Sequence, residues 1–372
     1  MKINKIVMRQ VQMPFKKAFE TSFDSMKFKN CLIVEIHDED GNVGYGECST
    51  FTKPYYNEEF IDGAWALLEN SLIPQTLAVK MEHPDETSKL FSRYRCNEMA
   101  KSSINCALWD LYAKENKLPL AKALGGTKDK VETGVSIGIQ KDVQSLLDAV
   151  KGYIEDGYHR VKIKIKPGKD VEYMTAVRKK FGDIMLMADA NSAYTLDDVD
   201  TFKKLDELGL IMIEQPLAHD DIVDHAELQS QIKTKICLDE SIVTLEDARK
   251  AIKLKSCGII NIKVARVGGL TEAKKIQKLG YDNGIGIWCG GMLDSGIARA
   301  HNIAAATLWG YTLPNDIAAS ERYYAHDIIN PMIKLDGTFI DVPKGSGIGF
   351  DPDIYYMDKF TVKKAVYSKK VK

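Results

Sequence analysis

A spacing of about 25 residues recurs through the middle of the chain and restricts the folds that it can adopt. Short apolar runs alternate there with amphipathic segments, and a charged residue lies at or just past the end of five successive runs. These residues, 25, 25, 25 and 24 positions apart, are Lys164, Asp189, Glu214, Asp239 and Lys263. Apolar strands alternating with helices are typical of a parallel sheet buried on both faces. One strand and one helix account for a period of this length.

Seven or eight strand–helix units fit between residues 134 and 318, enough to close a (β/α)8 barrel. The predicted strands occupy residues 135–139, 161–165, 184–187, 210–213, 236–238, 259–262 and 285–288. Predicted helices include residues 143–155, 196–208, 245–254 and 271–283. Such a barrel keeps its active site at the carboxyl ends of its strands, where the five charged residues lie. An open doubly wound sheet would not readily bring five strand ends around one point, so we predict an α/β fold of the barrel type.

The segments on either side of the barrel predict a second unit. Alternating strands are expected at 2–13 and in a hairpin of 31–37 with 43–47, and helices at 57–72 and 100–115. Strands followed by helices favour a separate α+β domain. We therefore expect an α+β capping domain at 1–125, the barrel at 126–318, and a C-terminal segment at 319–372, including a strand at 338–342, that returns to the cap.

Composition and charge exclude several classes of protein. Lysine and arginine number 51 against 52 aspartate and glutamate, so charge gives no reason to expect a nucleic-acid or anionic-membrane partner. The seven cysteines are scattered, which indicates reduced thiols. The N-terminus alternates polar and apolar residues unlike a signal peptide, and no stretch approaches ~18 uncharged apolar residues, so no membrane span is expected. These features together predict a cytoplasmic protein.

Three acids at neighbouring strand ends indicate a cation site. Asp189, Glu214 and Asp239 cannot all stay ionised together without a cation. Ligation by carboxylate oxygens suits a hard divalent ion, Mg²⁺ or Mn²⁺. For one acid alone, capping of the following helix or pairing with a lysine is the ordinary explanation. The common register of all three favours the metal site.

Lysines at strand ends indicate acid–base chemistry. Lys162 and Lys164 lie on one face of their strand, because strand side chains alternate. Lys263 follows the sixth strand, which faces the second in a ring of eight, so Lys164 and Lys263 are predicted to flank the three acids. We expect burial and crowding to lower the pKa of these lysines toward neutrality, as a general base requires. Salt bridges to the acids are the alternative.

These residues resemble those of the enolase superfamily, whose members use lysine or histidine bases with Mg²⁺. The resemblance covers nearly the whole chain. The pair Lys162 and Lys164 with Lys263 marks the muconate-lactonizing-enzyme-like subgroup, whereas mandelate-racemase-like members carry a catalytic histidine where this chain has Trp288 and Cys289. Longer motifs resemble the o-succinylbenzoate synthase / N-acylamino acid racemase family: GVSIGI at 134–139, DANSAY at 189–194, IEQPL at 213–217, CLDESI at 237–242, RVGG at 266–269 and WCGGM at 288–292.

The resemblance implies roles for the residues already singled out. Asp189, Glu214 and Asp239 would bind Mg²⁺, which holds the substrate carboxylate. Lys164 would remove the proton α to that carboxylate. Lys263 would stabilise the resulting enediolate as a cation, or protonate its opposite face.

The resemblance also implies weaker substrate contacts. Lys162 would tune Lys164 or touch the carboxylate, and Asn191 would lie beside the metal ligands. Ser136 and the turn of Gly291 and Met292 resemble the family's contacts to the acyl side chain.

Two cap segments, 19–23 and 50–56, resemble the family's specificity loops. Their aromatic residues, which could cover the site or simply pack, are Phe23, Phe51, Tyr55 and Tyr56. Asp294 and Lys166 depart from the residues usual in the family, and these departures bear on specificity because neither is a predicted ligand or base.

Two activities of the family remain open. The leading prediction is an Mg²⁺-dependent o-succinylbenzoate synthase of menaquinone biosynthesis, and the alternative is an N-acylamino acid or N-succinylamino acid racemase that transfers a proton between two lysines. Dipeptide epimerases carry Asp-x-Asp near the eighth strand, where this chain has Asn315-Asp316-Ile317. A catalytically inert binding barrel would not need both lysines beside an intact acid triad. The expected partner is a small-molecule carboxylate, and the resemblance implies a homo-oligomer.

Overall fold

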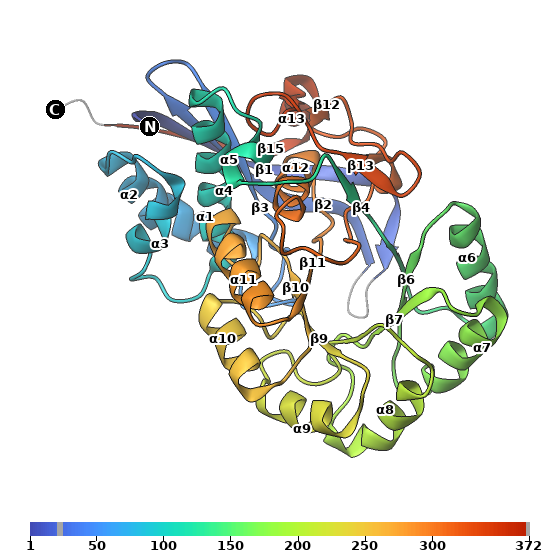
Figure 1. Cartoon of the computed structure of the whole chain (residues 1–372). Coiled ribbons are helices and arrows are strands. Elements are labelled where there is room, and N and C mark those ends of the chain that lie inside the picture. The colour runs from blue at the N-terminus through green and yellow to red at the C-terminus, as the bar shows by residue number, and fades with distance from the viewer. Residues whose placement is uncertain (21–24, 370–372) are drawn as a thin grey trace.

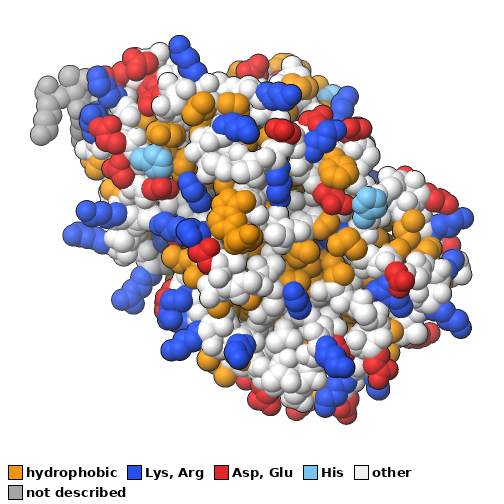
Figure 2. Space-filling model, in the orientation of Figure 1, with side chains coloured by type: hydrophobic (Ala, Val, Ile, Leu, Met, Phe, Trp, Pro, Cys, Tyr) orange, Lys and Arg blue, Asp and Glu red, His pale blue; other side chains and the backbone are white. Residues whose placement is uncertain are grey.

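The computed structural model describes residues 1–20 and 25–369 and divides the chain into a barrel and a cap (Figure 1). Acidic and basic side chains are interspersed over the face shown in Figure 2, in keeping with a formal net charge of −1. Within the described ranges, no helix has the length and apolar character needed to cross a membrane.

Seven parallel strands form the barrel sheet, hydrogen-bonded in the order β11-β10-β9-β8-β7-β6-β5. They are β5 (Val135–Ile137), β6 (Arg160–Lys164), β7 (Met185–Asp189), β8 (Ile213–Glu214), β9 (Ile236–Leu238), β10 (Ile259–Ile262) and β11 (Gly286–Cys289). Helices follow the strands and lie outside the ring: α6 (Val143–Glu155), α7 (Val171–Phe181), η3 (Leu196–Asp198) with α8 (Val199–Asp206), α9 (Val223–Gln231), α10 (Leu245–Leu254), α11 (Leu270–Asp282) and α12 (Gly296–Ala306). The predicted barrel is therefore confirmed. The strands β5 and β8 are shorter than the apolar runs that predict them, and β7 is longer.

An irregular segment takes the place of an eighth strand. The amide of Thr312 donates to the carbonyl of Ile287 at 2.9 Å, and the carbonyl of Asn315 accepts from the amide of Gly134 at 2.8 Å. The segment thus connects β11 to the residues that precede β5 and closes the ring. Pro314 has no N–H to donate to a sheet ladder, which explains why this position is not a regular strand.

Large side chains fill the barrel interior, as this fold requires. A cluster of buried residues lies there, formed by Met187, Met212, Cys237, Ile259 and Trp288. The indole of Trp288 faces two cations, with the Arg160 guanidinium 5.2 Å and the Lys162 ammonium 5.0 Å from its ring centroid.

The cap contains a four-stranded sheet in the order β15-β1-β2-β3. Its strands are β1 (Ile3–Glu20), β2 (Ser25–Asp38), β3 (Val43–Cys48) and β15 (Thr361–Ser368). Its helices are α1 (Ile61–Leu67), η1 (Leu68–Leu72), α2 (Ile73–Ala78), η2 (Pro84–Glu86), α3 (Thr87–Leu90), α4 (Glu98–Glu115) and α5 (Leu120–Leu124). Because β15 pairs antiparallel with β1, the C-terminal tail completes the cap as predicted.

The rest of the tail pairs with itself, lies against the barrel, or contacts the cap, where Asp358 pairs with Arg9 of β1. Its elements are η4 (Ser320–Arg322), β12 (Ile329–Asn330), β13 (Phe339–Asp341), β14 (Asp351–Pro352) and α13 (Ile354–Phe360). The predicted strand at 338–342 is present as β13, but it pairs with β4 (Lys130–Glu132) next to the barrel and not with the cap.

One predicted helix has different boundaries. The helix expected at 57–72 begins at Ile61 and continues to Ala78 through the π-helical turn η1. Its start is delayed because Glu59 is engaged elsewhere, accepting from the amides of Met99 at 2.7 Å and Ala100 at 2.9 Å at the start of α4. The wide turn just precedes Pro74, which removes one helical hydrogen bond and displaces the preceding carbonyl.

Candidate active site

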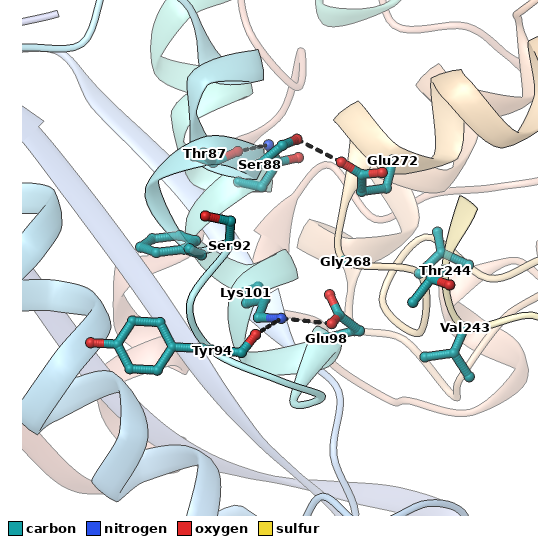
Figure 3. A pocket seen from close by; sticks show the side chains of 13 residues that line it. Thr87, Ser88, Ser92, Tyr94, Glu98, Lys101, Val243, Thr244, Gly268 and Glu272 are labelled. Atoms are coloured by element: carbon teal, nitrogen blue, oxygen red, sulfur yellow. Dashed lines mark hydrogen bonds and ion pairs between the residues drawn. The ribbon is translucent and has the colours of Figure 1, made fainter. Parts of the chain in front are cut away.

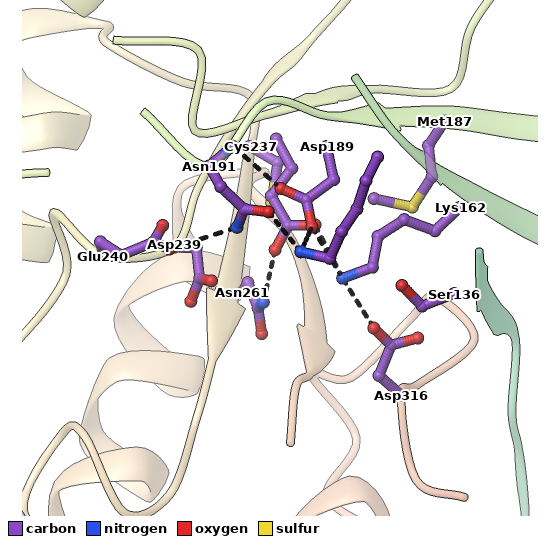
Figure 4. Close-up of polar contacts among 12 residues, drawn as sticks. Ser136, Lys162, Met187, Asp189, Asn191, Cys237, Asp239, Glu240, Asn261 and Asp316 are labelled. Carbon is purple, nitrogen blue, oxygen red and sulfur yellow. Dashed lines mark hydrogen bonds and ion pairs between the residues drawn. The ribbon is translucent and has the colours of Figure 1, made fainter. Parts of the chain in front are cut away.

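Three carboxylates lie at the carboxyl ends of neighbouring barrel strands, and two of them, Asp189 and Asp239, are labelled in Figure 4. Asp189 ends β7, Glu214 ends β8, and Asp239 directly follows β9. Asp189 and Glu214 are register partners, which brings their side chains together. All three residues are at most 2 % exposed. The structure therefore places the three predicted acids, all buried, at the ends of three adjacent strands.

Two lysines of β6 contact this triad from one side. The Lys162 ammonium lies 3.1 Å from Glu214 Oε2, 3.4 Å from Asp189 Oδ2 and 2.7 Å from Asp316 Oδ2. The Lys164 ammonium lies 3.2 Å from Asp189 Oδ2 and donates to Asn191 Oδ1. The Lys164 side chain is 36 % exposed, so a substrate can reach it from solvent.

Lys263 approaches from the opposite side of the ring. It follows β10, the sixth strand, whereas Lys164 ends β6, the second. Its ammonium lies 2.8 Å from Asp239 Oδ2, and Arg266 pairs with the other oxygen of Asp239. Lys164 and Lys263 therefore lie on either side of the three acids, as the sequence predicts.

Burial and mutual repulsion separate the acidities of the three carboxyls. Burial, with the charge of Asp189 next in size, raises the pKa of Glu214 to about 8. Burial also opposes ionisation of Asp239, but Arg266 and Lys263 outweigh it and lower the pKa of Asp239 to about 2. The pKa of Asp189 is lowered because Lys164 and Lys162 together outweigh its burial.

The expectation of lowered lysine pKa values is wrong for Lys162 and Lys263. Burial favours the neutral amine in both, but the facing carboxylates outweigh it. Asp316 and Glu214 raise the pKa of Lys162, and Asp239 raises that of Lys263. In this structure Lys162 and Lys263 therefore form salt bridges with the acids, which is the alternative to lowered pKa values.

The donor set fits a divalent cation, although no three His, Cys, Asp or Glu side chains in the described ranges already converge as a metal site. Lysine and arginine neutralise the triad instead. Burial and the charge of Asp189 disfavour the ionised form of Glu214, and a bound cation would stabilise that form. The buried Oδ1 of Asn261, whose amide nitrogen donates to Glu214 at 2.7 Å, has no hydrogen-bond partner among the described residues. Oxygen donors of this kind are those that Mg²⁺ prefers.

The predicted substrate contacts divide into two groups. Ser136, Lys162 and Asn191 lie with the triad at the same end of the barrel (Figure 4). Gly291 and Met292 lie in the turn after β11, but the Met292 side chain is 5 % exposed and packs into the hydrophobic core of the cap. Any contact that Met292 makes with a substrate would involve its backbone.

Only part of the predicted cap aromatics can be placed. Phe23 lies outside the described residues. The Tyr56 hydroxyl accepts from Lys263 at 3.1 Å and from Arg266 at 3.0 Å, so this cap residue reaches the site. Phe51 packs edge-on against Tyr56, and Tyr55 is 46 % exposed.

Two residues of the site, both inside segments quoted above, were not predicted to belong to it. Asp316 pairs with Lys162 at 2.7 Å and with Arg160 at 2.5 Å, and Glu240 lies beside Asn191 with a pKa that burial raises to about 7. Asp316 could have been found, because two cations inside a barrel strand require a counter-charge and 315–317 occupies the predicted eighth position.

A cavity of about 200 Å³ lies elsewhere, between cap helices α3 and α4 and the barrel loops that precede α10 and α11 (Figure 3). Its polar lining includes the ion pair of Glu98 with Lys101, whose charged atoms are 2.6 Å apart. None of the predicted site residues lines this cavity.

A barrel with acids at three successive strand ends, lysines across from one another, and an α+β cap that reaches the site defines the enolase class of enzymes. Residues 3–125 match the family described as mandelate racemase / muconate lactonizing enzyme, N-terminal domain, and residues 145–356 match the enolase C-terminal domain-like family. The chain belongs to the enolase superfamily, within the o-succinylbenzoate synthase / N-acylamino acid racemase family.

Its relatives carry two names. An o-succinylbenzoate synthase of Geobacillus stearothermophilus is 52 % identical over 359 residues, covering 96 % of each chain. An N-succinylamino acid racemase of Amycolatopsis sp. is 42 % identical over 365 residues, covering 98 % of this chain and 99 % of the relative. The crystal structure of an enolase superfamily member from Listeria innocua superposes with a TM-score of 0.98 at 43 % identity, covering all of both chains.

Proposed function

We propose that this protein is an o-succinylbenzoate synthase that eliminates water from 2-succinyl-6-hydroxy-2,4-cyclohexadiene-1-carboxylate, a step of menaquinone biosynthesis. The observation that carries the proposal is the placement of Lys164 and Lys263 on opposite sides of the buried acid triad. Relatives named o-succinylbenzoate synthase support it, four of them at 45–52 % identity along nearly the full chain.

Asp189, Glu214 and Asp239 would hold the divalent cation that this superfamily uses, and we propose Mg²⁺, with Mn²⁺ as a substitute. When bound, the cation supplies positive charge against which negative charge develops on the substrate carboxylate. The carboxylates present oxygen donors from three adjacent strands, so their positions are set by the barrel sheet and not by a mobile loop.

Lys164 is the proposed general base. Its amine takes the proton from the carbon α to the substrate carboxylate, and the C–H electron pair forms the enediolate. The C–O bond to the ring hydroxyl then breaks, and Lys164 returns the proton to the departing oxygen, so water leaves on the same face. Lys263, held as a cation by Asp239, stabilises the enediolate from the other face.

A racemase is the second candidate, and the same pair of lysines supports it. Lys164 would take the α-proton of an N-acylamino acid from one face, and Lys263 would deliver a proton to the other. Two relatives named N-succinylamino acid racemase are 41–42 % identical to this chain. Both reactions pass through an enediolate, so one site can serve both.

The proposal includes the setting of the enzyme. We expect a cytoplasmic homo-oligomer acting on a small carboxylate, with a cap at 1–125, a barrel at 126–318 and a tail at 319–372. Ser136, Lys162, Asn191 and the turn of Gly291 and Met292 are the proposed substrate contacts.

The test is a side-by-side assay of purified protein with Mg²⁺. Dehydration of the cyclohexadiene carboxylate is followed by absorbance, and racemisation of N-succinyl and N-acetyl amino acids by polarimetry, with Lys164→Ala as the blank. Efficient dehydration with slow racemisation is the expected result. Fast racemisation with little dehydration would instead assign the racemase. Failure of both reactions would refute the proposal and favour a binding barrel.

A further inference from the structure

The turn between β11 and α12 lies where the barrel meets the cap. Both backbone polar groups of its residue Met292 are hydrogen-bonded to charged side chains. The carbonyl of Met292 accepts from the Lys29 ammonium at 3.1 Å, and its amide donates to Asp294 Oδ2 at 3.0 Å. The next residue, Leu293, has a φ of +58°, a backbone conformation that costs a non-glycine residue free energy. Such a conformation persists only where its surroundings hold it in place.

The cation that holds the carbonyl comes from the cap. Lys29 lies on β2, is 4 % exposed, and pairs with Glu47 Oε1 of β3 at 3.3 Å. Glu47 also accepts from Ser49 Oγ at 2.7 Å and from the amide of Ser295, at the start of α12, at 3.1 Å. One buried ammonium thus connects two cap strands to the residues on either side of Leu293.

Asp294 holds the other side of the turn from within the barrel domain. Its Oδ2 also accepts from Asn302 of α12 at 2.9 Å, and Ser49 Oγ lies 3.4 Å from its Oδ1. Burial, followed by the charge of Glu47, raises the pKa of Asp294, whereas Lys29 lowers it. Removing Lys29 would therefore leave two buried acids facing one another.

The turn is coupled to the proposed active site through Asp316. A Cβ built on Gly291 would lie 3.0 Å from the Asp316 carbonyl and 3.2 Å from Asp294 Oδ2, so the turn packs closely against the residue that pairs with Lys162. A shift of Met292 would move Gly291 and change the space beside Asp316.

We propose that Lys29 is a positioning residue that fixes the Gly291–Met292 turn and thereby sets the room available to the acyl side of the substrate. The inference rests on the proposed function, because the contact between this turn and the acyl group is part of that proposal. Lys29 touches no reacting atom and acts through the Met292 carbonyl. A residue of cap strand β2 then influences which acyl groups the barrel site accepts.

The test compares two doubly substituted proteins. Lys29→Met with Glu47→Gln removes both charges of the buried pair, so that Asp294 no longer faces a second acid. Arg9→Met with Glu35→Gln is the matched control, because that pair is 7 % and 8 % exposed and bridges β1 and β2. Its other ion pairs among the described residues join Asp358 and His37, not the turn. Lys29→Met alone shows the added effect of the uncompensated acids.

Two readouts are measured. Hydrogen exchange of peptides covering 289–296 should become about tenfold faster in the first double variant and stay unchanged in the control. KM for N-succinyl amino acids should rise about tenfold relative to N-acetyl amino acids, with kcat within about twofold, as expected for lost positioning of a non-reacting group.

Unchanged exchange in the turn would overturn the inference, and so would faster exchange with an unaltered preference between the two acyl groups. Exchange is measured without substrate. If the wild-type protein catalyses neither reaction, the proposed function fails, and the exchange result still decides whether Lys29 holds the turn.

Discussion

Replacing Glu214 by glutamine should stabilise the metal-free protein at alkaline pH while abolishing its response to Mg²⁺. Glu214 is fully buried, and its pKa is raised from 4.5 to about 8 by burial and by Asp189. The pKa of this carboxyl is higher in the folded protein than the value of 4.5 expected in the unfolded chain. The free energy of unfolding is therefore unaffected by Glu214 below pH 4.5, and it decreases as the pH rises from 4.5 toward 8. A glutamine has no such dependence.

The magnitude follows from that difference. At about 1.4 kcal/mol for each pH unit, a pKa of about 8 in place of 4.5 costs the wild type up to about 5 kcal/mol above pH 8. At about 2.1 cal/mol/K per residue, unfolding of 372 residues carries about 0.8 kcal/mol/K, so the variant should melt roughly 6 °C above the wild type at pH 9. At pH 6 the difference should fall to about 2 kcal/mol, roughly 3 °C.

The surroundings of Glu214 can form hydrogen bonds with the side-chain amide of the Glu214→Gln variant. Glu214 Oε1 accepts from the Asn261 side-chain amide at 2.7 Å, and within the part of the chain that the structure describes the buried Oδ1 of Asn261 has no hydrogen-bond partner. Rotation of the Asn261 amide would therefore let its oxygen accept from the side-chain nitrogen that Glu214→Gln introduces, while the other oxygen position still faces Lys162 at 3.1 Å.

The assay is thermal unfolding in EDTA at pH 6 and pH 9, repeated with Mg²⁺. Glu246→Gln, a change at an exposed carboxylate of α10, is the control. Parallel pH profiles for wild type and Glu214→Gln in EDTA would refute the argument from buried like charges. Equal stabilisation of both proteins by Mg²⁺ would refute the assignment of Glu214 as a metal ligand.

Other perturbations test the remaining parts of the site. Lys164→Ala and Lys263→Ala should each lower turnover at least about 10³-fold with unchanged circular dichroism, and retention of most of the turnover by either variant would contradict the two-lysine mechanism. Chelation should abolish activity and Mg²⁺ or Mn²⁺ should restore it, whereas turnover that resists EDTA would overturn the metal assignment. Asp316→Asn should destabilise the protein by about 3–5 kcal/mol in urea unfolding at pH 7, because it leaves Arg160 and Lys162 without their shared counter-charge. Unchanged stability would show that the two cations find another partner.

Local pattern was sufficient for most of the barrel. Each of the seven apolar runs contains or borders a strand, because parallel strands buried on both faces must be apolar along their whole length. The eighth position was not predictable in the same way. Its segment carries Pro314, and only its hydrogen bonds to Gly134 and Ile287 show that it closes the ring.

The start of helix α1 is a second feature that the sequence did not predict correctly. The polar residues at 57–60 resemble a helix start, but Glu59 is used at the start of α4, about 40 residues further along. A side chain that satisfies a distant backbone group leaves no signal in the neighbouring sequence.

The sequence by itself determined the identity and register of the acids and lysines, because a repeat of one strand and one helix places every 25th residue at the same end of a barrel. Only the tertiary structure decided how their charges balance. Asp316 raises the pKa of Lys162, Arg266 lowers that of Asp239, and Tyr56 of the cap reaches Lys263. These pairings join residues from different strands and from the cap, and electrostatic energies depend on distance and burial in the folded chain, which spacing along the sequence does not specify.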